Sequence, residues 1–222
     1  RGGQPVQPWP QGTNQQDEID ALHFSTPDGE SISFGDYLQR TYADATLILH
    51  NGEVIYEAYH QGMPAHHPHM LWSVTKSFTG LLATQLIHEG VLDAEAQVTD
   101  YVPELADSGW SGATLQQVLN MTADINYNEV YGDEQSNVFE YAMAAGMAPA
   151  PDDFTGYRTL SEYLPSIGPG SREHGDAFIY RTVHTEVLGW IVRRASGQSL
   201  ADLISERLWQ QLGAEHDAYL LL

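Results

Sequence analysis

Two apolar stretches near residue 50 alternate with polar positions in the manner typical of β-strands. They cover Ala45–His50 and Glu53–Tyr59 and are joined by Asn51-Gly52. An Asn-Gly pair readily takes up the positive φ angles of a two-residue hairpin turn. The pattern therefore predicts a β-hairpin over residues 45–59.

Apolar residues recur at helical spacing further along the chain. The spacing predicts helices from Ser73 to Glu89, over Thr185–Ala195 and over Ser199–Leu212, and Ser199 and Asp202 have the spacing of a capping box. The other expected features are short helices at 36–43, 114–121, 136–145 and 159–164, a loose arm at 1–20, a loop at 60–70, a turn at Tyr101–Leu105 and loop-rich sequence at 122–175.

A lone pair of strands is marginally stable in water, so the hairpin needs further strands. None is evident after residue 60 until the strand-like Ala218–Leu222 at the end of the chain. We therefore expect the sheet to be completed by residues beyond Leu222 or by a second chain.

Charge and composition narrow the choice of function. The 222 residues include 30 acidic and nine basic side chains, a net charge of −21, which repels nucleic acid and anionic membranes. Such a charge suits a protein living in salt and equally suits an ordinary acidic surface. No apolar run is long enough to span a bilayer, no signal peptide is visible in Arg1–Gln16, and cysteine is absent. We expect a soluble protein that is cytoplasmic, or exported with its leader already removed.

Lys76 is the only lysine in the chain, and Ser73 precedes it by three positions at the start of a predicted helix. Residues three apart share a helix face, so Nζ can reach Oγ. A desolvated lysine can lose its proton, whereas arginine effectively cannot. A serine hydroxyl is a weak nucleophile until a base removes its proton. The pair indicates a nucleophile with its base; the alternative is a helix cap at Ser73 beside a solvated Lys76.

Three other groups compete for a chemical role. Ser111 lies in Gly-Trp-Ser-Gly-Ala, which lacks the last glycine of a nucleophile elbow and the strand before it, so we interpret it as a turn or N-cap. His66, His67 and His69 suggest zinc, but their spacing suits one site poorly and favours a solvated loop. Tyr180 precedes a predicted helix, where its phenol can shuttle protons; the alternative is a core tyrosine with one hydrogen bond.

Several ordered motifs resemble the serine β-lactamase and penicillin-binding-protein superfamily. They are Ser73-Val-Thr-Lys76-Ser-Phe-Thr-Gly80 after a hairpin, Val98-Thr-Asp-Tyr-Val-Pro-Glu-Leu105, and Tyr180-Arg-Thr followed by Val187-Leu-Gly-Trp-Ile-Val192. Gln117-Val-Leu-Asn-Met121, and Ile125-Asn-Tyr-Asn-Glu129 with Tyr131, are most similar to the class C-like esterases and the 6-aminohexanoate-dimer (nylon oligomer) hydrolase branch. The resemblance runs from about residue 42 to residue 222.

The resemblance implies an α/β fold of the α+β type, with an antiparallel sheet flanked by helices, a helical domain and the site between them. Ser73 would form the acyl-enzyme, its N–H would be half of the oxyanion hole, Lys76 would be the base and Tyr180 the second acid/base. Tyr131 would line the acyl pocket and Thr182 would contact the substrate, although the family usually has Asn or Ser at the Thr182 position. No cofactor and no metal are implied.

The resemblance also implies a division of the chain into an arm at 1–35, the first part of an α/β domain at 36–72, and the catalytic helix with a helical domain at 73–222. The family's third motif, a Gly-containing strand that supplies the second oxyanion donor, is absent up to Leu222. We therefore expect the C-terminal strands to be missing from this chain.

The leading hypothesis is a serine hydrolase that cleaves small linear amides or carboxylic esters through an acyl-serine. The alternatives are β-lactamase or D-amino peptidase-like activity, a catalytically silent binding or sensor domain on the same scaffold, and a metal-binding module at the histidine loop.

Overall fold

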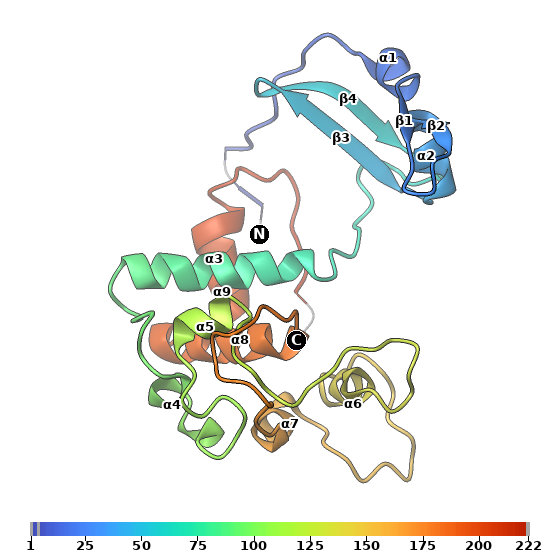
Figure 1. Ribbon diagram of the computed structural model, residues 1–222. Coiled ribbons are helices and arrows are strands. Elements are labelled where there is room, and N and C mark those ends of the chain that lie inside the picture. Colours follow the sequence, from blue (N-terminus) through green and yellow to red (C-terminus); the bar gives the residue numbers. More distant parts are fainter. Residues whose placement is uncertain (1, 4, 221–222) are drawn as a thin grey trace. The chain divides into compact units, whose positions relative to one another are not determined.

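The computed structural model describes residues 2–3 and 5–220, which form two compact units (Figure 1). The first unit contains the chain up to Met70 together with Leu212–Ala218. The second contains Leu71–Gln211 and the chain from Tyr219 onward. Each unit has its own core of buried side chains and is described by itself.

The predicted hairpin is confirmed in the first unit. Strands β3 (Ala45–His50) and β4 (Glu53–Tyr59) pair antiparallel. Asn51 and Gly52 have φ angles of 52° and 83°, the left-handed values that the tight turn requires. One face of β4 is buried, because its alternate side chains Val54, Tyr56 and Ala58 point inward.

The segment before this hairpin is more structured than the expected arm at residues 1–35. It contains helix α1 (Gln16–Asp20) and a short second hairpin, β1 (His23–Ser25) with β2 (Ser31–Ser33). The Tyr56 hydroxyl donates a hydrogen bond of 2.7 Å to Asp20 Oδ1, which joins α1 to β4. Helix α2 (Phe34–Arg40) follows β2 and begins two residues earlier than predicted, because Ser33 Oγ caps it.

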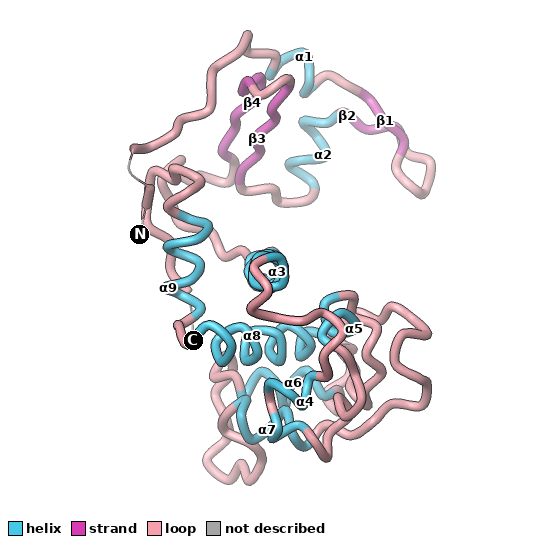
Figure 2. The backbone as a smooth tube through the Cα atoms, turned by 90° about the vertical axis from the view of Figure 1, so that its left-hand side faces the viewer, coloured by secondary structure: helices cyan, strands magenta, loops and turns pink. Residues whose placement is uncertain are grey.

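Helices α3 (Val74–His88) and α8 (Thr182–Ser196) form the centre of the second unit. Figure 2 shows α3 end-on and α8 from the side, so the two helices cross. Leu82 and Leu86 of α3 are buried in the same cluster as Val187 and Ile191 of α8. The apolar positions that predicted these two helices therefore lie at their shared core.

Shorter helices surround this crossing. They are α4 (Val98–Tyr101), a 3-10 turn at Pro103–Leu105, α5 (Leu115–Leu119), α6 (Asn137–Ala144), α7 (Leu160–Ser166), α9 (Leu200–Ile204) and a π-helical turn at Ser205–Trp209. The cap predicted at Ser199 is confirmed, because Ser199 Oγ accepts a hydrogen bond of 3.1 Å from Asp202 N–H. The helix expected to continue to Leu212 is wrong in its second half, where the winding widens to a π-turn.

In the described part of the chain, β3 has β4 as its strand partner, and β4 makes one further bridge, to Gln11. Residues 218–220 form no strand, and positions 221–222 of the expected strand at Ala218–Leu222 lie outside the described residues. The completion of the sheet by later residues or by a second chain stays a prediction. Among the residues described, no helix has the length and apolar character needed to cross a bilayer.

Candidate active site

Ser73 immediately precedes α3, and Lys76 follows it by about one turn of the helix. Lys76 Nζ donates a hydrogen bond of 3.0 Å to Ser73 Oγ. Ser73 itself has helical backbone angles, with φ −68° and ψ −12°, and its side chain caps no backbone N–H. The alternative interpretation of Ser73 as a helix cap beside a solvated Lys76 is therefore wrong: the two side chains contact each other.

The residue before Ser73 holds an uncommon backbone conformation. Trp72 has a φ angle of 45°, in the left-handed region that bulky residues rarely enter. Such a conformation costs about 1–2 kcal/mol for an L-residue. The sharp turn is closed by Val74 N–H and Thr75 N–H, which donate to the carbonyls of Leu71 and Trp72 at 3.0 Å each. Backbone strain of this kind clusters at functional sites, where it fixes an exposed side chain.

The Ser73 N–H group is available to a ligand. None of the residues that the structure describes accepts a hydrogen bond from it, whereas the next three N–H groups all donate within the turn. A free N–H beside the hydroxyl, at the positive end of a 15-residue helix, is suited to an oxyanion.

Tyr180 comes to the same place from a segment more than 100 positions later. Lys76 Nζ lies 5.6 Å from the centre of the Tyr180 ring. Tyr180 is about two-fifths exposed, with a relative accessibility of 42%, so it is not a core tyrosine. The structure thus brings together the three residues for which sequence predicts chemistry.

Thr182 begins α8 and is held by Glu129. Its backbone N–H donates to Glu129 Oε1, and its hydroxyl donates to Glu129 Oε2 at 3.1 Å. A carboxylate at a helix N-terminus accepts hydrogen bonds from free N–H groups and interacts favourably with the helix dipole. This cap explains why α8 begins at Thr182 and not at the expected Thr185.

Tyr131 is exposed, with a relative accessibility of 73%. Partial burial, and then the charges of Glu129 and Tyr180, raise the pKa of its phenol. A neutral, exposed phenol near Tyr180 provides an apolar ring for a substrate to contact.

The other candidates lie apart from this constellation. Ser111 is exposed in a turn, as expected, and its carbonyl faces the imidazole of His174 at 3.2 Å. His69 Nε2 lies 2.8 Å from Asp44 Oδ2 in the first unit, and this hydrogen bond raises the pKa of His69. Within the described ranges, His66, His67 and His69 belong to no cluster of three or more ligands able to hold a metal ion.

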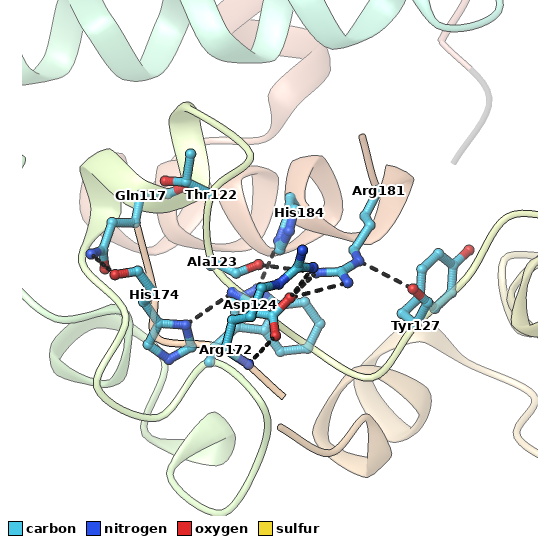
Figure 3. A network of polar contacts seen from close by, with 10 residues as sticks. Gln117, Thr122, Ala123, Asp124, Tyr127, Arg172, His174, Arg181 and His184 are labelled. Atoms are coloured by element: carbon cyan, nitrogen blue, oxygen red, sulfur yellow. Dashed lines mark hydrogen bonds and ion pairs between the residues drawn. The ribbon is translucent and has the colours of Figure 1, made fainter. Parts of the chain in front are cut away.

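The sequence did not predict the buried ion pair that Arg181, next to Tyr180, forms with Asp124. Figure 3 shows Arg181 and Arg172 converging on the carboxylate of Asp124. Burial alone would raise the pKa of Asp124, but hydrogen bonds from Arg172 and Arg181 outweigh it and lower the pKa to about 2. The available signal was Arg181 itself, a charged residue between two apolar segments in a chain with few basic residues.

Comparison with known proteins gives this geometry a context. The chain matches the family described as Beta-lactamase over residues 35–220. A 6-aminohexanoate-dimer hydrolase of Paenarthrobacter ureafaciens is 37% identical over 202 residues, covering 90% of this chain and 49% of that protein. Esterase EstB of Burkholderia gladioli is 28% identical over 189 residues, covering 79% and 46%. The chain thus spans about half the length of these curated relatives.

Solved structures agree with the sequence matches. A Bacillus anthracis protein described as a 6-aminohexanoate-dimer hydrolase superimposes with a TM-score of 0.84 at 28% identity, over 96% of this chain and 55% of that one. A class C β-lactamase superimposes with a TM-score of 0.59 at 22% identity, over 82% and 47%, which shows a shared fold. The expected mixed α/β, β-lactamase-like fold is confirmed, and with the match over residues 35–220 and the 37% identity, the chain belongs to the Beta-lactamase family.

Proposed function

We propose that this chain carries the nucleophile of a serine hydrolase that cleaves small linear amides or carboxylic esters through an acyl-serine. The observation that supports this most directly is the 3.0 Å contact between Lys76 Nζ and Ser73 Oγ, with the centre of the Tyr180 ring 5.6 Å from the same Nζ. The hydroxyl, its base and a second proton carrier thereby share one exposed surface of the second unit.

The first half-reaction begins at Ser73. Lys76 Nζ takes the hydroxyl proton as Oγ forms a bond to the substrate carbonyl carbon. The carbonyl oxygen becomes an oxyanion, and the free Ser73 N–H donates to it. When the tetrahedral intermediate collapses, the C–N or C–O bond breaks and the leaving amine or alcohol takes up the proton, relayed from Lys76 through Tyr180.

The second half-reaction returns the enzyme to its starting state. Water attacks the acyl-serine carbonyl and gives a proton to the same basic groups. The Ser73 Oγ–carbon bond then breaks, Oγ is reprotonated, and the carboxylic acid leaves. The two halves use the same residues in reverse order, as general acid–base catalysis requires.

The substrate class rests on the relatives and on the chemistry of the site. One relative is described as a hydrolase of 6-aminohexanoate dimer, a linear amide, and another as an esterase. Both names describe acyl transfer to water, which is the reaction that an activated serine performs. The exposed Tyr131 and Trp72 offer aromatic surface on which a flexible acyl chain can lie.

A fluorophosphonate probe tests the proposal, because it reacts only with an activated serine. We expect one adduct on a folded protein that contains residues 1–222, located at Ser73 by peptide mass spectrometry. Lys76→Arg should fold and stay unlabelled, since arginine keeps its proton. Ser111→Ala is the matched control and should be labelled as wild type, because Ser111 lies in a separate turn. A folded, unlabelled wild type would instead support the silent binding domain.

A further inference from the structure

Arg181 is a charged residue whose side chain is buried. It lies between Tyr180 and Thr182, and its side chain is only 9% exposed. Removing a guanidinium from water is costly unless its donors are paired. A buried arginine at this point in the chain therefore calls for a role that depends on its contacts.

The guanidinium contacts three consecutive parts of one loop. Arg181 Nε donates to the Tyr127 carbonyl at 3.1 Å, and Nη1 donates to the Ala123 carbonyl at 3.3 Å. Nη1 and Nη2 also donate to Asp124 Oδ1 at 3.2 and 3.3 Å (Figure 3). The side chain thus fastens the backbone before α8 to residues 123–127. The planar fork of arginine allows this set of bonds, and lysine cannot reproduce it.

The backbone conformation at Arg181 determines how the side chains of the neighbouring residues are oriented. Its φ and ψ are −145° and 117°, an extended conformation. In extended backbone, successive side chains point to opposite sides. Arg181 points into the core toward Asp124, so Tyr180 is directed the other way, and the centre of its ring lies 5.6 Å from Lys76 Nζ.

The same loop also holds Thr182, through Glu129. Glu129 accepts two hydrogen bonds from Thr182, one from the backbone and one from the hydroxyl. Two carboxylates from residues 124–129 therefore fix the two residues that follow Tyr180. The arrangement leaves the Tyr180 segment little freedom to rotate its phenol away from Lys76.

We propose that Arg181, anchored by Asp124, is a positioning residue that aims the Tyr180 phenol at the proton path between Lys76 and the leaving group. This inference rests on the proposed function. It assigns the ion pair a task in leaving-group protonation in addition to its contribution to the core.

Leaving-group dependence tests this assignment, because p-nitrophenolate departs without a proton whereas ethoxide needs one. We would compare kcat/KM for p-nitrophenyl butyrate and ethyl butyrate, which give the same acyl-serine. In Arg181→Lys we expect the ethyl ester rate to fall about 100-fold, the loss typical of a small displacement of a catalytic group. We expect the p-nitrophenyl ester rate to fall less than about threefold.

Two further variants keep the result interpretable. Asp124→Asn removes the anchoring charge and should show the same selective loss, so the test stands if Arg181→Lys folds poorly. Arg172→Lys alters the other arginine that contacts Asp124, at 3.0 Å, but not the Tyr180 segment, and should leave the ratio of the two rates unchanged. Thermal unfolding verifies that each variant is folded at the assay temperature.

The outcomes separate the two proposals. Equal losses on both esters, or no loss on either, would overturn the positioning role and leave Arg181 as a purely structural residue. If fluorophosphonate does not label Ser73 in the folded wild-type protein, the proposed function itself fails. Labelling at Ser73 together with an unchanged ester ratio in Arg181→Lys would reject the positioning role alone.

Discussion

His184 makes the stability of this protein depend on pH in a predictable direction. It is fully buried, its Nδ1 accepts a hydrogen bond of 3.0 Å from the Trp110 indole, and its Nε2 has no partner among the described residues. Burial, and next the charge of Arg181, lower the pKa of His184 from 6.5 to about 4. Between pH 4 and pH 6.5 the histidine is protonated in the unfolded chain and neutral in the folded one, so a fall in pH favours unfolding.

The magnitude follows from linkage. Because the folded pKa is the lower one, the stabilisation is fully present above pH 6.5 and is lost as the pH falls toward 4. Each pKa unit corresponds to about 1.4 kcal/mol, so the full effect is about 3 kcal/mol and the loss between pH 7 and pH 5 is about 2 kcal/mol. Asp124, with a pKa of about 2, loses stabilising charge only below about pH 4, outside this window.

Urea unfolding at pH 7 and pH 5 measures this effect. His184→Asn keeps an acceptor for Trp110 and removes the titration, so the variant should lose about 2 kcal/mol less than wild type over this range. His66→Asn changes an exposed histidine and should behave as wild type. The exposed His69 has a raised pKa and acts in the opposite direction, but it is present in all three proteins and cancels in the comparison. An equal loss in His184→Asn and wild type would refute the reasoning.

Three further predictions follow from local geometry and charge. Gly170→Ala should lower the free energy of unfolding by about 1–3 kcal/mol in thermal denaturation, since its Cβ would lie 2.1 Å from Asp124 Oδ2. Gly168→Ala is the control, because its Cβ would meet no atom within 4 Å, and equal effects of the two substitutions would contradict the close approach of Gly170 to Asp124. Trp72→Gly should be about 1 kcal/mol more stable than Trp72→Ala if the left-handed backbone is required, and equal stabilities would argue against that strain. With a net charge of −21, the melting temperature should rise between 0.1 and about 1 M KCl, and a flat response would show that self-repulsion is unimportant.

The features predicted correctly from sequence are those set by neighbouring residues. The Asn51-Gly52 turn needs only two residues with positive φ, and the Ser73–Lys76 contact needs only the geometry of one helical turn. Both depend on backbone conformations that the local sequence strongly favours. The approach of Tyr180 to Lys76, in contrast, depends on the crossing of α3 and α8.

The features that sequence did not reveal depend on distant partners. Asp124 and Arg181 are 57 positions apart, and Glu129 and Thr182 are 53 apart. The sequence of their loop has neither helical nor strand periodicity, because side-chain hydrogen bonds to distant residues stabilise the loop. Glu129 also moves the start of α8 forward, which a periodicity centred on its apolar residues cannot show.

The central claim is that Ser73, activated by Lys76, becomes covalently acylated by a substrate. Rapid quenching of the folded protein with p-nitrophenyl butyrate, followed by peptide mass spectrometry, measures this directly. We expect a burst of p-nitrophenol and a butyryl group on the peptide that contains Ser73, with neither in Lys76→Arg. A butyryl group on another residue, or an undiminished burst in Lys76→Arg, would contradict the account.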